Sequence, residues 1–211
     1  MPVKLLQYWN VRSESRAGFD SFFSGEFVPE VTGSGLMKIT GSWHVASGEG
    51  PYFIAEGVSR SLVEVQDLVM GPVFQTLRRR LLLLASDYAT KLLLPADPAG
   101  VKEVEVERGF KFTQHFNVNP ADHFEYLDFT GREYLPALAR FGLETVGGWT
   151  VAVGATPYVI NESRAADLGL IGHMLESREY QDLTLRLLGL VTGYGCKILV
   201  PSGHVNRIEG S

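Results

Sequence analysis

The chain has 211 residues, of which 45% are hydrophobic and 20% are charged, a composition typical of globular proteins and not of disordered ones. Its formal net charge is −5 and no basic cluster offsets this charge, which disfavours nucleic acids and anionic membranes as partners. One cysteine, no signal-peptide pattern and apolar runs far shorter than the ~20 residues of a membrane helix predict a cytoplasmic protein without an internal disulfide.

The first hundred residues predict six elements in the order strand, helix, strand, strand, helix, strand. Dense apolar and aromatic residues indicate the strands, and phenylalanines spaced by three and four indicate the first helix. A glycine-rich turn before Pro51 joins the two central strands as a hairpin. The predicted elements are a strand at 4–11, a helix at 13–32, strands through 43–45 and at 52–57, a helix over 62–86 interrupted at 71–72, and a strand at 88–94.

The second half of the chain repeats this pattern. Residues 41–95 match residues 147–201 at a constant offset of 106, and about 20 of these 55 positions are identical. Upstream, residues 4–35 match residues 111–142 at an offset of 107. Repeats of this length indicate a duplicated domain. We therefore predict one repeat at 1–96, a linker at 97–108 and a second repeat at 109–204.

Helix boundaries in the second repeat have their own signals. Asn119 followed by Pro120 predicts an N-cap and a proline in the first helical turn, where a missing N–H costs nothing. Ser177 stands where the first repeat has its Gly-Pro interruption, so we expect it to cap the last helix. These signals place a helix after the first strand and another before the last strand.

The order of elements has few compact solutions. Right-handed crossovers place both helices on one face of a four-stranded antiparallel sheet, the ferredoxin-like arrangement. Strands such as 92–94 and 198–200 are too apolar to leave the other face in water, so both faces must be buried. The predicted fold class is α+β: two ferredoxin-like βαββαβ repeats packed sheet to sheet as an intramolecular α/β barrel.

Short motifs occur at matching positions in both halves: Gly41, Trp43, Phe74, Gln75, Tyr88, Lys91 and Pro95, with Gly147, Trp149, Tyr180, Gln181, Tyr194, Lys197 and Pro201. These motifs resemble the NIPSNAP family, within the dimeric α/β-barrel superfamily. Members usually have one such unit and dimerise, whereas two are fused here, so a monomer or a homodimer is expected. The resemblance implies a small-molecule pocket between sheet and helices. Relatives include cofactor-free monooxygenases, haem-binding enzymes, isomerases and proteins with no known reaction.

Histidine is the most informative candidate for chemistry. In the strand over 110–118, Lys111, Thr113, His115 and Asn117 share one face, and a polar face in a buried sheet indicates a cavity. His115 titrates near neutral pH, which makes it a candidate general base, with Asn117 or Tyr126 orienting a substrate oxygen. The alternative is a core histidine that is hydrogen-bonded to backbone or water.

Further candidates depend on how the halves fold. Asn10 and Asn117 occur in both halves and either cap the next helix or face a pocket. His44 either lines the pocket of the first half or lies at the barrel rim. The candidate ligand-binding residues are Tyr8, Asn10, His44, Asn117, Tyr126, Tyr134 and His173.

No strong cofactor signature is present. HxH, HExxH and CxxC spacings are absent, so no metal site is expected, and haem bound through His115, His123 or His173 is the alternative. GxSxG, P-loop and GxGxxG motifs are absent too. Two alternative functions are compatible with these residues and motifs. The first is a small-molecule binding protein of unknown activity, and the second is a cofactor-free monooxygenase, isomerase or lyase that acts on an aromatic or polyketide-like compound with His115 as base.

Overall fold

The computed structural model describes residues 1–96, here called the first half, and residues 108–206, here called the second half. Most of the linker predicted at 97–108 lies outside the described residues. The first half contains β1 (Val3–Val11), η1 (Ser13–Ser15), α1 (Arg16–Phe22), η2 (Phe23–Phe27), α2 (Val28–Gly33), β2 (Lys38–Ser47), β3 (Phe53–Ser59), α3 (Leu62–Met70), α4 (Pro72–Leu84) and β4 (Ala85–Pro95).

The second half has the same order of elements. It contains β5 (Phe110–Val118), η3 (Pro120–Asp122), α5 (His123–Phe129), η4 (Thr130–Tyr134), α6 (Leu135–Arg140), β6 (Glu144–Val153), β7 (Val159–Ala165), α7 (Leu168–Glu176), α8 (Arg178–Leu190) and β8 (Val191–Pro201). None of the helices in the described ranges is long and apolar enough to span a membrane.

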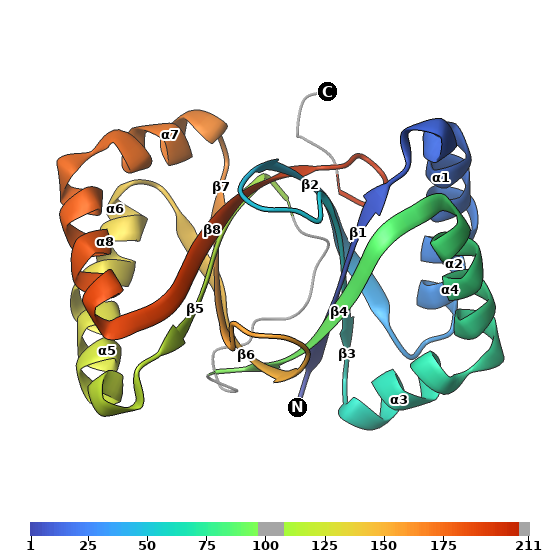
Figure 1. The fold of residues 1–211 in the computed structure, drawn as a ribbon, viewed down its shortest axis with the longest axis horizontal. Coiled ribbons are helices and arrows are strands. Elements are labelled where there is room, and N and C mark those ends of the chain that lie inside the picture. Colours follow the sequence, from blue (N-terminus) through green and yellow to red (C-terminus); the bar gives the residue numbers. More distant parts are fainter. Residues whose placement is uncertain (97–107, 207–211) are drawn as a thin grey trace.

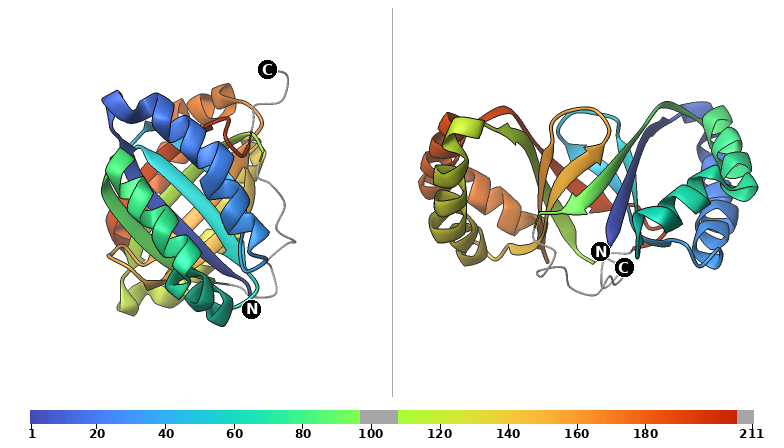
Figure 2. Two further views of the ribbon diagram at one scale, coloured as in Figure 1. Left: turned by 90° about the vertical axis from the view of Figure 1, so that its right-hand side faces the viewer. Right: turned by 90° about the horizontal axis from the view of Figure 1, so that it is seen from below.

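The eight strands form one closed antiparallel barrel. Its order is β1-β3-β2-β8-β5-β7-β6-β4, so the sheets of the two halves join at the β2–β8 and β4–β6 edges. The helices of the two halves cover opposite sides of this barrel (Figure 1; Figure 2, right). The α+β class and the sheet-to-sheet barrel predicted from the repeat are therefore confirmed.

The helix boundaries agree with their sequence signals except at one cap. The Ser177 side chain accepts a hydrogen bond from the N–H of Tyr180, at 3.1 Å, and so caps α8 as predicted. Asn119 makes no side-chain cap, because its Nδ2 donates to a carboxylate oxygen of Asp122 instead. The predicted helix over 13–32 is a helical run that includes the π-helical turn Phe23–Phe27.

Each half has its own apolar core between sheet and helices. In the first half, the rings of Trp9, Phe19, Phe23 and Phe53 are fully buried and contact one another edge to face or stacked. In the second half the corresponding core surrounds Phe116. The strand residues in these cores lie on the outer faces of the strands. The residues on the inner faces therefore pack against one another inside the barrel.

The inner faces meet around four buried charges, here called the barrel cluster: Lys4, Glu56, Lys111 and Glu162. Each lysine makes its shorter contact with the glutamate of the other half, since Lys4 Nζ lies 2.6 Å from Glu162 and Lys111 Nζ lies 2.8 Å from Glu56. The contacts within each half, Lys4 to Glu56 and Lys111 to Glu162, measure 3.2 and 3.6 Å. The four charges sum to zero.

Two tryptophans complete the barrel cluster. The Lys4 ammonium lies 4.7 Å from the centre of the Trp149 ring, and Lys111 lies 4.8 Å from that of Trp43. The indole N–H of Trp149 also donates to Glu162 at 2.8 Å. Buried ions require such compensation, because the cost of taking each charge out of water is several kcal/mol.

We predict that Lys111→Met destabilises the fold by about 3–5 kcal/mol, because it leaves an excess negative charge inside the barrel. The matched control is Arg80→Met, which breaks the exposed Arg80–Glu26 pair on the surface of α4. Solvent screens that pair, so the control should lose far less stability. Urea unfolding of both variants measures the difference, and equal losses would contradict a stabilising role for the barrel cluster.

Candidate functional site

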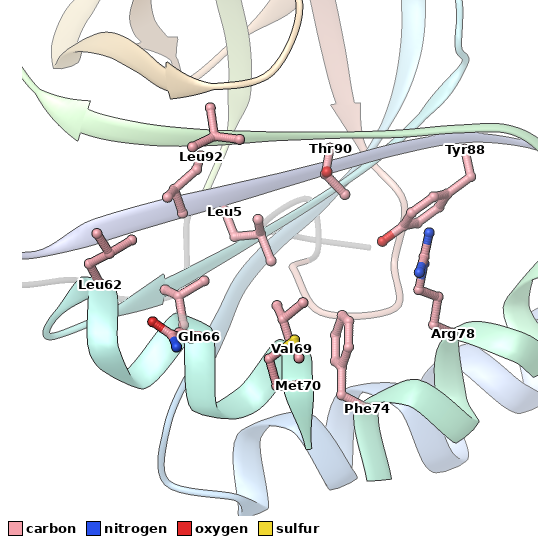
Figure 3. A pocket seen from close by; sticks show the side chains of 12 residues that line it. Leu5, Leu62, Gln66, Val69, Met70, Phe74, Arg78, Tyr88, Thr90 and Leu92 are labelled. Atoms are coloured by element: carbon pink, nitrogen blue, oxygen red, sulfur yellow. The ribbon is translucent and has the colours of Figure 1, made fainter. Parts of the chain in front are cut away.

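An open cavity lies between the sheet and the helices of the first half, and is here called the helix–sheet cavity (Figure 3). Its volume is about 360 Å³. Leu5 and Leu92 on the strands, and Val65, Val69 and Phe74 on α3 and α4, form its apolar walls. This is the position in which the sequence resemblance placed a ligand pocket.

The connection between α3 and α4 shapes this cavity. Gly71 ends α3 and Pro72 begins α4, because proline fits the first turn of a helix but cannot continue one. The rim remains apolar although it meets solvent, since Leu62, Met70 and Val153 are 54%, 74% and 64% exposed. An apolar rim around an apolar hollow is typical of a small-molecule or partner site.

Arg78 and Tyr88 form a polar end of the helix–sheet cavity (Figure 3). The guanidinium carbon of Arg78 lies 5.3 Å from the centre of the Tyr88 ring. The Tyr88 hydroxyl donates to Oε1 of Gln7 at 3.0 Å. Burial raises the pKa of Tyr88 to about 12, against the opposing effect of Arg78, so this hydroxyl stays protonated at neutral pH. The cavity thus offers one exposed cation and one hydroxyl to a ligand.

The second half has a different polar arrangement at the equivalent positions. Nε2 of Gln114 donates to the hydroxyls of Tyr134 and Tyr194 at 2.6 and 2.9 Å. Tyr134 in turn donates to Tyr180 at 3.4 Å. Three tyrosines and a glutamine therefore satisfy one another inside the second core.

The first half lacks two of those hydroxyls. In the alignment of the halves, Phe27 and Phe74 stand where Tyr134 and Tyr180 stand. Among the described residues, the buried Nε2 of Gln7 consequently has no hydrogen-bond partner. A buried amide donor without a partner costs about 1–3 kcal/mol, so the first half carries an unused polar group near its cavity.

A second hollow of about 250 Å³ lies inside the barrel and is here called the barrel cavity. It brings together Tyr8 and His115, two of the predicted site residues. Burial, and then the charges of Lys197 and Lys91, lower the pKa of His115 to about 4. Gly195 faces His115 across the β5–β8 ladder, and a side chain there would overlap the imidazole. The polar face of β5 therefore borders a cavity, and its histidine is neutral at pH 7.

The two asparagines fasten loops instead of capping helices or lining a cavity. Oδ1 of Asn10 accepts the N–H of Tyr52 at 2.8 Å, and Oδ1 of Asn117 accepts the N–H of Tyr158 at 2.9 Å. Each asparagine thereby anchors the hairpin of its own half. Their presence in both halves is explained by a shared structural role.

The remaining predicted residues do not gather into one site. Tyr126 and Tyr134 belong to the second helix–sheet core, on the opposite face of β5 from His115, so Tyr126 does not orient a ligand at His115. His44 lies against the Phe53 ring, and burial lowers its pKa. His173 is exposed on α7 beside Phe141.

The cofactor alternatives have little support from the donor set. In residues 1–96 and 108–206, no group of three or more His, Cys, Asp or Glu side chains is arranged to hold a metal ion. No histidine lines the helix–sheet cavity, and His123 and His173 are exposed on helices. His115 lies in the smaller barrel cavity, among lysines. These residues do not fit haem bound through a histidine.

The barrel cluster and Arg78 are functional candidates that the sequence interpretation missed. Lys4 pairs with Lys111, and Glu56 with Glu162, in the alignment of the halves, and charged residues repeated within otherwise apolar strands were the available signal. Arg78 gave no such signal, because it stands in a run of three arginines at the surface of a helix.

We expect Gln114→Met to destabilise the fold by about 1–3 kcal/mol, because it deprives two buried tyrosine hydroxyls of their shared donor. The matched variant Gln7→Met should cost less, since it loses one hydrogen bond but also removes a donor that has no partner among the described residues. Urea denaturation of the two variants compares them directly. If Gln7→Met lost as much stability as Gln114→Met, or more, the hydrogen bonds of the two glutamines would contribute alike in the two halves.

Comparisons with known proteins agree on the fold. No family model and no curated protein matches the sequence. A proposed monooxygenase from Lactobacillus acidophilus NCFM has a similar structure, with a TM-score of 0.63, 15% identity, and coverage of 94% of this chain and 93% of that one. A proposed chlorite dismutase gives a TM-score of 0.64 at 10% identity, covering 97% and 96% of the two chains.

Two further solved structures match nearly all or part of this chain. An anthrone oxidase-like protein gives a TM-score of 0.57 at 15% identity, covering 94% of this chain and 91% of that one. A NIPSNAP domain protein from Burkholderia xenovorans is 16% identical and matches 44% of this chain with 95% of its own length, at a TM-score of 0.37. The full-length likenesses show that this chain shares the α+β barrel fold of these proteins.

Proposed function

We propose that this protein binds a small, mainly apolar organic compound in the helix–sheet cavity, with an acidic or hydroxyl group of the ligand at Arg78 and Tyr88. The observation that carries the proposal is the combination of an apolar hollow with a single polar end. The volume of about 360 Å³ lies at the lower end of the range for ligand pockets, which favours a compound of two or three rings.

The two ends of the cavity have separate roles in this proposal. Leu5, Val69 and Leu92 exclude water from the ligand body, and this burial supplies most of the affinity. Arg78 is exposed, so its attraction for an anion is moderated by solvent and serves mainly to orient the ligand. The protonated Tyr88 hydroxyl, which already donates to Gln7, has lone pairs that can accept a hydrogen bond from a ligand hydroxyl.

The anionic dye 1-anilinonaphthalene-8-sulfonate tests this site through its fluorescence in apolar surroundings. Val69→Trp, which fills the cavity, and Arg78→Met, which removes its cation, should each weaken binding by about tenfold. Arg79→Met is the matched control, because Arg79 is the next residue on α4, hydrogen-bonds to its own helix and does not line the cavity. Unchanged binding to Val69→Trp or to Arg78→Met would contradict the proposal.

A second candidate function is cofactor-free oxygenation of an aromatic or polyketide-like compound. Arg78 beside Tyr88 favours it, since a cation and a hydroxyl at one end of an apolar cavity stabilise the negative oxygen that forms when such a substrate loses a proton. The structural likeness to proposed monooxygenases and to an anthrone oxidase-like protein is consistent with this chemistry. His115 would act as the base only for a compound held in the barrel cavity.

Anthrone tests this second function directly, because one anthrone and one O₂ give anthraquinone and water. We expect the protein to accelerate anthraquinone formation and oxygen uptake above the rate in buffer. Loss of this acceleration in Arg78→Met, with His115→Asn unaffected, would place the reaction in the helix–sheet cavity, since the barrel cavity of about 250 Å³ is too small for the three rings of anthrone. A rate equal to that in buffer would exclude anthrone oxidation.

A further inference from the structure

The barrel cavity is lined by two lysines, one from each half, whose charges influence each other. Lys91 comes from β4 of the first half and Lys197 from β8 of the second, and both line the cavity. Nζ of Lys91 donates to the carbonyl of Pro157 at 3.3 Å, and Nζ of Lys197 donates to the carbonyl of Glu49. Each ammonium has three donors, so one backbone contact leaves capacity for a ligand.

The lysines of the barrel cluster are paired with buried glutamates, whereas, among the described residues, these two ammonium groups are not. In the described part of the chain, no carboxylate lies within ion-pair distance of Lys91 or Lys197. The Glu49 carboxylate is the nearest acidic influence on Lys197, and its side chain is exposed at the cavity entrance. Burial lowers the pKa of both lysines. Lys197 lowers that of Lys91 further, whereas Glu49 partly opposes the effect of burial on Lys197.

Tyr8 and His115 also line the barrel cavity and supply two further hydrogen-bond donors. The Tyr8 hydroxyl makes no hydrogen bond to any residue of 1–96 or 108–206. Burial and the charges of Glu56 and Glu162 raise the pKa of Tyr8, so it keeps its proton and remains a donor. A ligand oxygen inside the barrel would therefore meet donors from both halves.

Apolar side chains form the walls of the barrel cavity, beside Thr113, Thr156 and the glutamates Glu49, Glu56 and Glu162. These apolar side chains are Leu6, Ile54, Ile160 and Leu199, and they come from strands of both halves. The volume of about 250 Å³ limits an occupant to a compound of about one ring. The carboxylates of Glu56 and Glu162 are paired with Lys4 and Lys111. Lys91 and Lys197 against the exposed Glu49 then leave a net positive charge at this cavity.

From this arrangement we propose that the barrel interior is a second binding site, which takes a small monocarboxylate with an apolar body. The carboxylate lies between Lys91 and Lys197, and the apolar body lies against Leu6, Ile54 and Ile160. The site is built from both halves and is separate from the helix–sheet cavity, so it does not depend on the function proposed for that cavity.

The charges around His115 give this site a direct readout. Lys91 on β4 and Lys197 on β8 disfavour the imidazolium, whereas Glu49 favours it. The other charged groups at this cavity are Glu56 on β3 and Glu162 on β7, paired with Lys4 and Lys111, while Tyr8 on β1 is neutral. A bound carboxylate would offset the two lysines and raise the pKa of His115 above its value of about 4. Affinity should therefore be constant near neutral pH and increase only once the pH falls below the raised pKa of His115.

Benzoate is the probe, and benzamide, of the same shape without the charge, is its control. The His115 ring resonances, assigned with His115→Gln, are followed by NMR while each compound is added to about 50 mM, above the roughly millimolar dissociation constant expected for so small a ligand. We expect a saturable shift with benzoate, a higher His115 pKa in its presence, and no comparable response to benzamide.

Variants then locate the bound anion. Lys91→Met and Lys197→Met should each weaken benzoate binding by about tenfold, whereas Arg78→Met, in the helix–sheet cavity, should leave it unchanged. No saturable shift, an equal response to benzamide, or loss of binding in Arg78→Met would overturn the proposal. If the lysine variants fail to fold because their loop contacts are lost, the benzoate and benzamide titrations of the unmodified protein decide the question.

Discussion

Four charges buried at the centre of one barrel constrain the whole structure. Lys4 and Lys111 point inward from the first strand of each half, and each makes its shortest ion pair with the glutamate of the other half. Neither half alone could bury its lysine and glutamate with the same partners, since the compensating tryptophans and carboxylates come from both. Closing the barrel brings the two lysines and the two glutamates together away from water, and the same closure creates the hollow that His115 lines.

The two halves keep the same frame but use their outer cores differently. In the second half, hydroxyls of Tyr134 and Tyr194 satisfy Gln114, and the core is held by a polar network. In the first half, Phe27 and Phe74 stand in place of Tyr134 and Tyr180, and an apolar hollow opens beside Arg78 and Tyr88. Two changes from tyrosine to phenylalanine therefore distinguish the first core, with its Gln7 donor unpaired within the described residues, from the hydrogen-bonded second core.

Several candidate residues were recognisable from sequence, but their grouping was not. The alternation along β5 placed His115 on a polar face, and the structure shows the cavity that this face borders. Asn10 and Asn117 were recognised as a repeated pair, yet their amides hold hairpin loops, a contact between segments about forty residues apart. Expectations centred on the second half, where four of the five histidines are. The helix–sheet cavity lies in the first half instead, and it was missed because its polar end uses an arginine on a helix surface.

The sequence by itself determined the element order, the two βαββαβ units and the need to bury both faces of each sheet, because periodicity and repetition are local properties that the chain displays directly. It also determined that Lys4, Lys111, Glu56 and Glu162 recur in pairs. Only the tertiary structure decided that these charges neutralise one another across the barrel and that Tyr8 meets His115. Contacts between residues so far apart in the sequence depend on how two twisted sheets close on each other. Packing over the whole molecule sets this closure, and no short stretch of residues does.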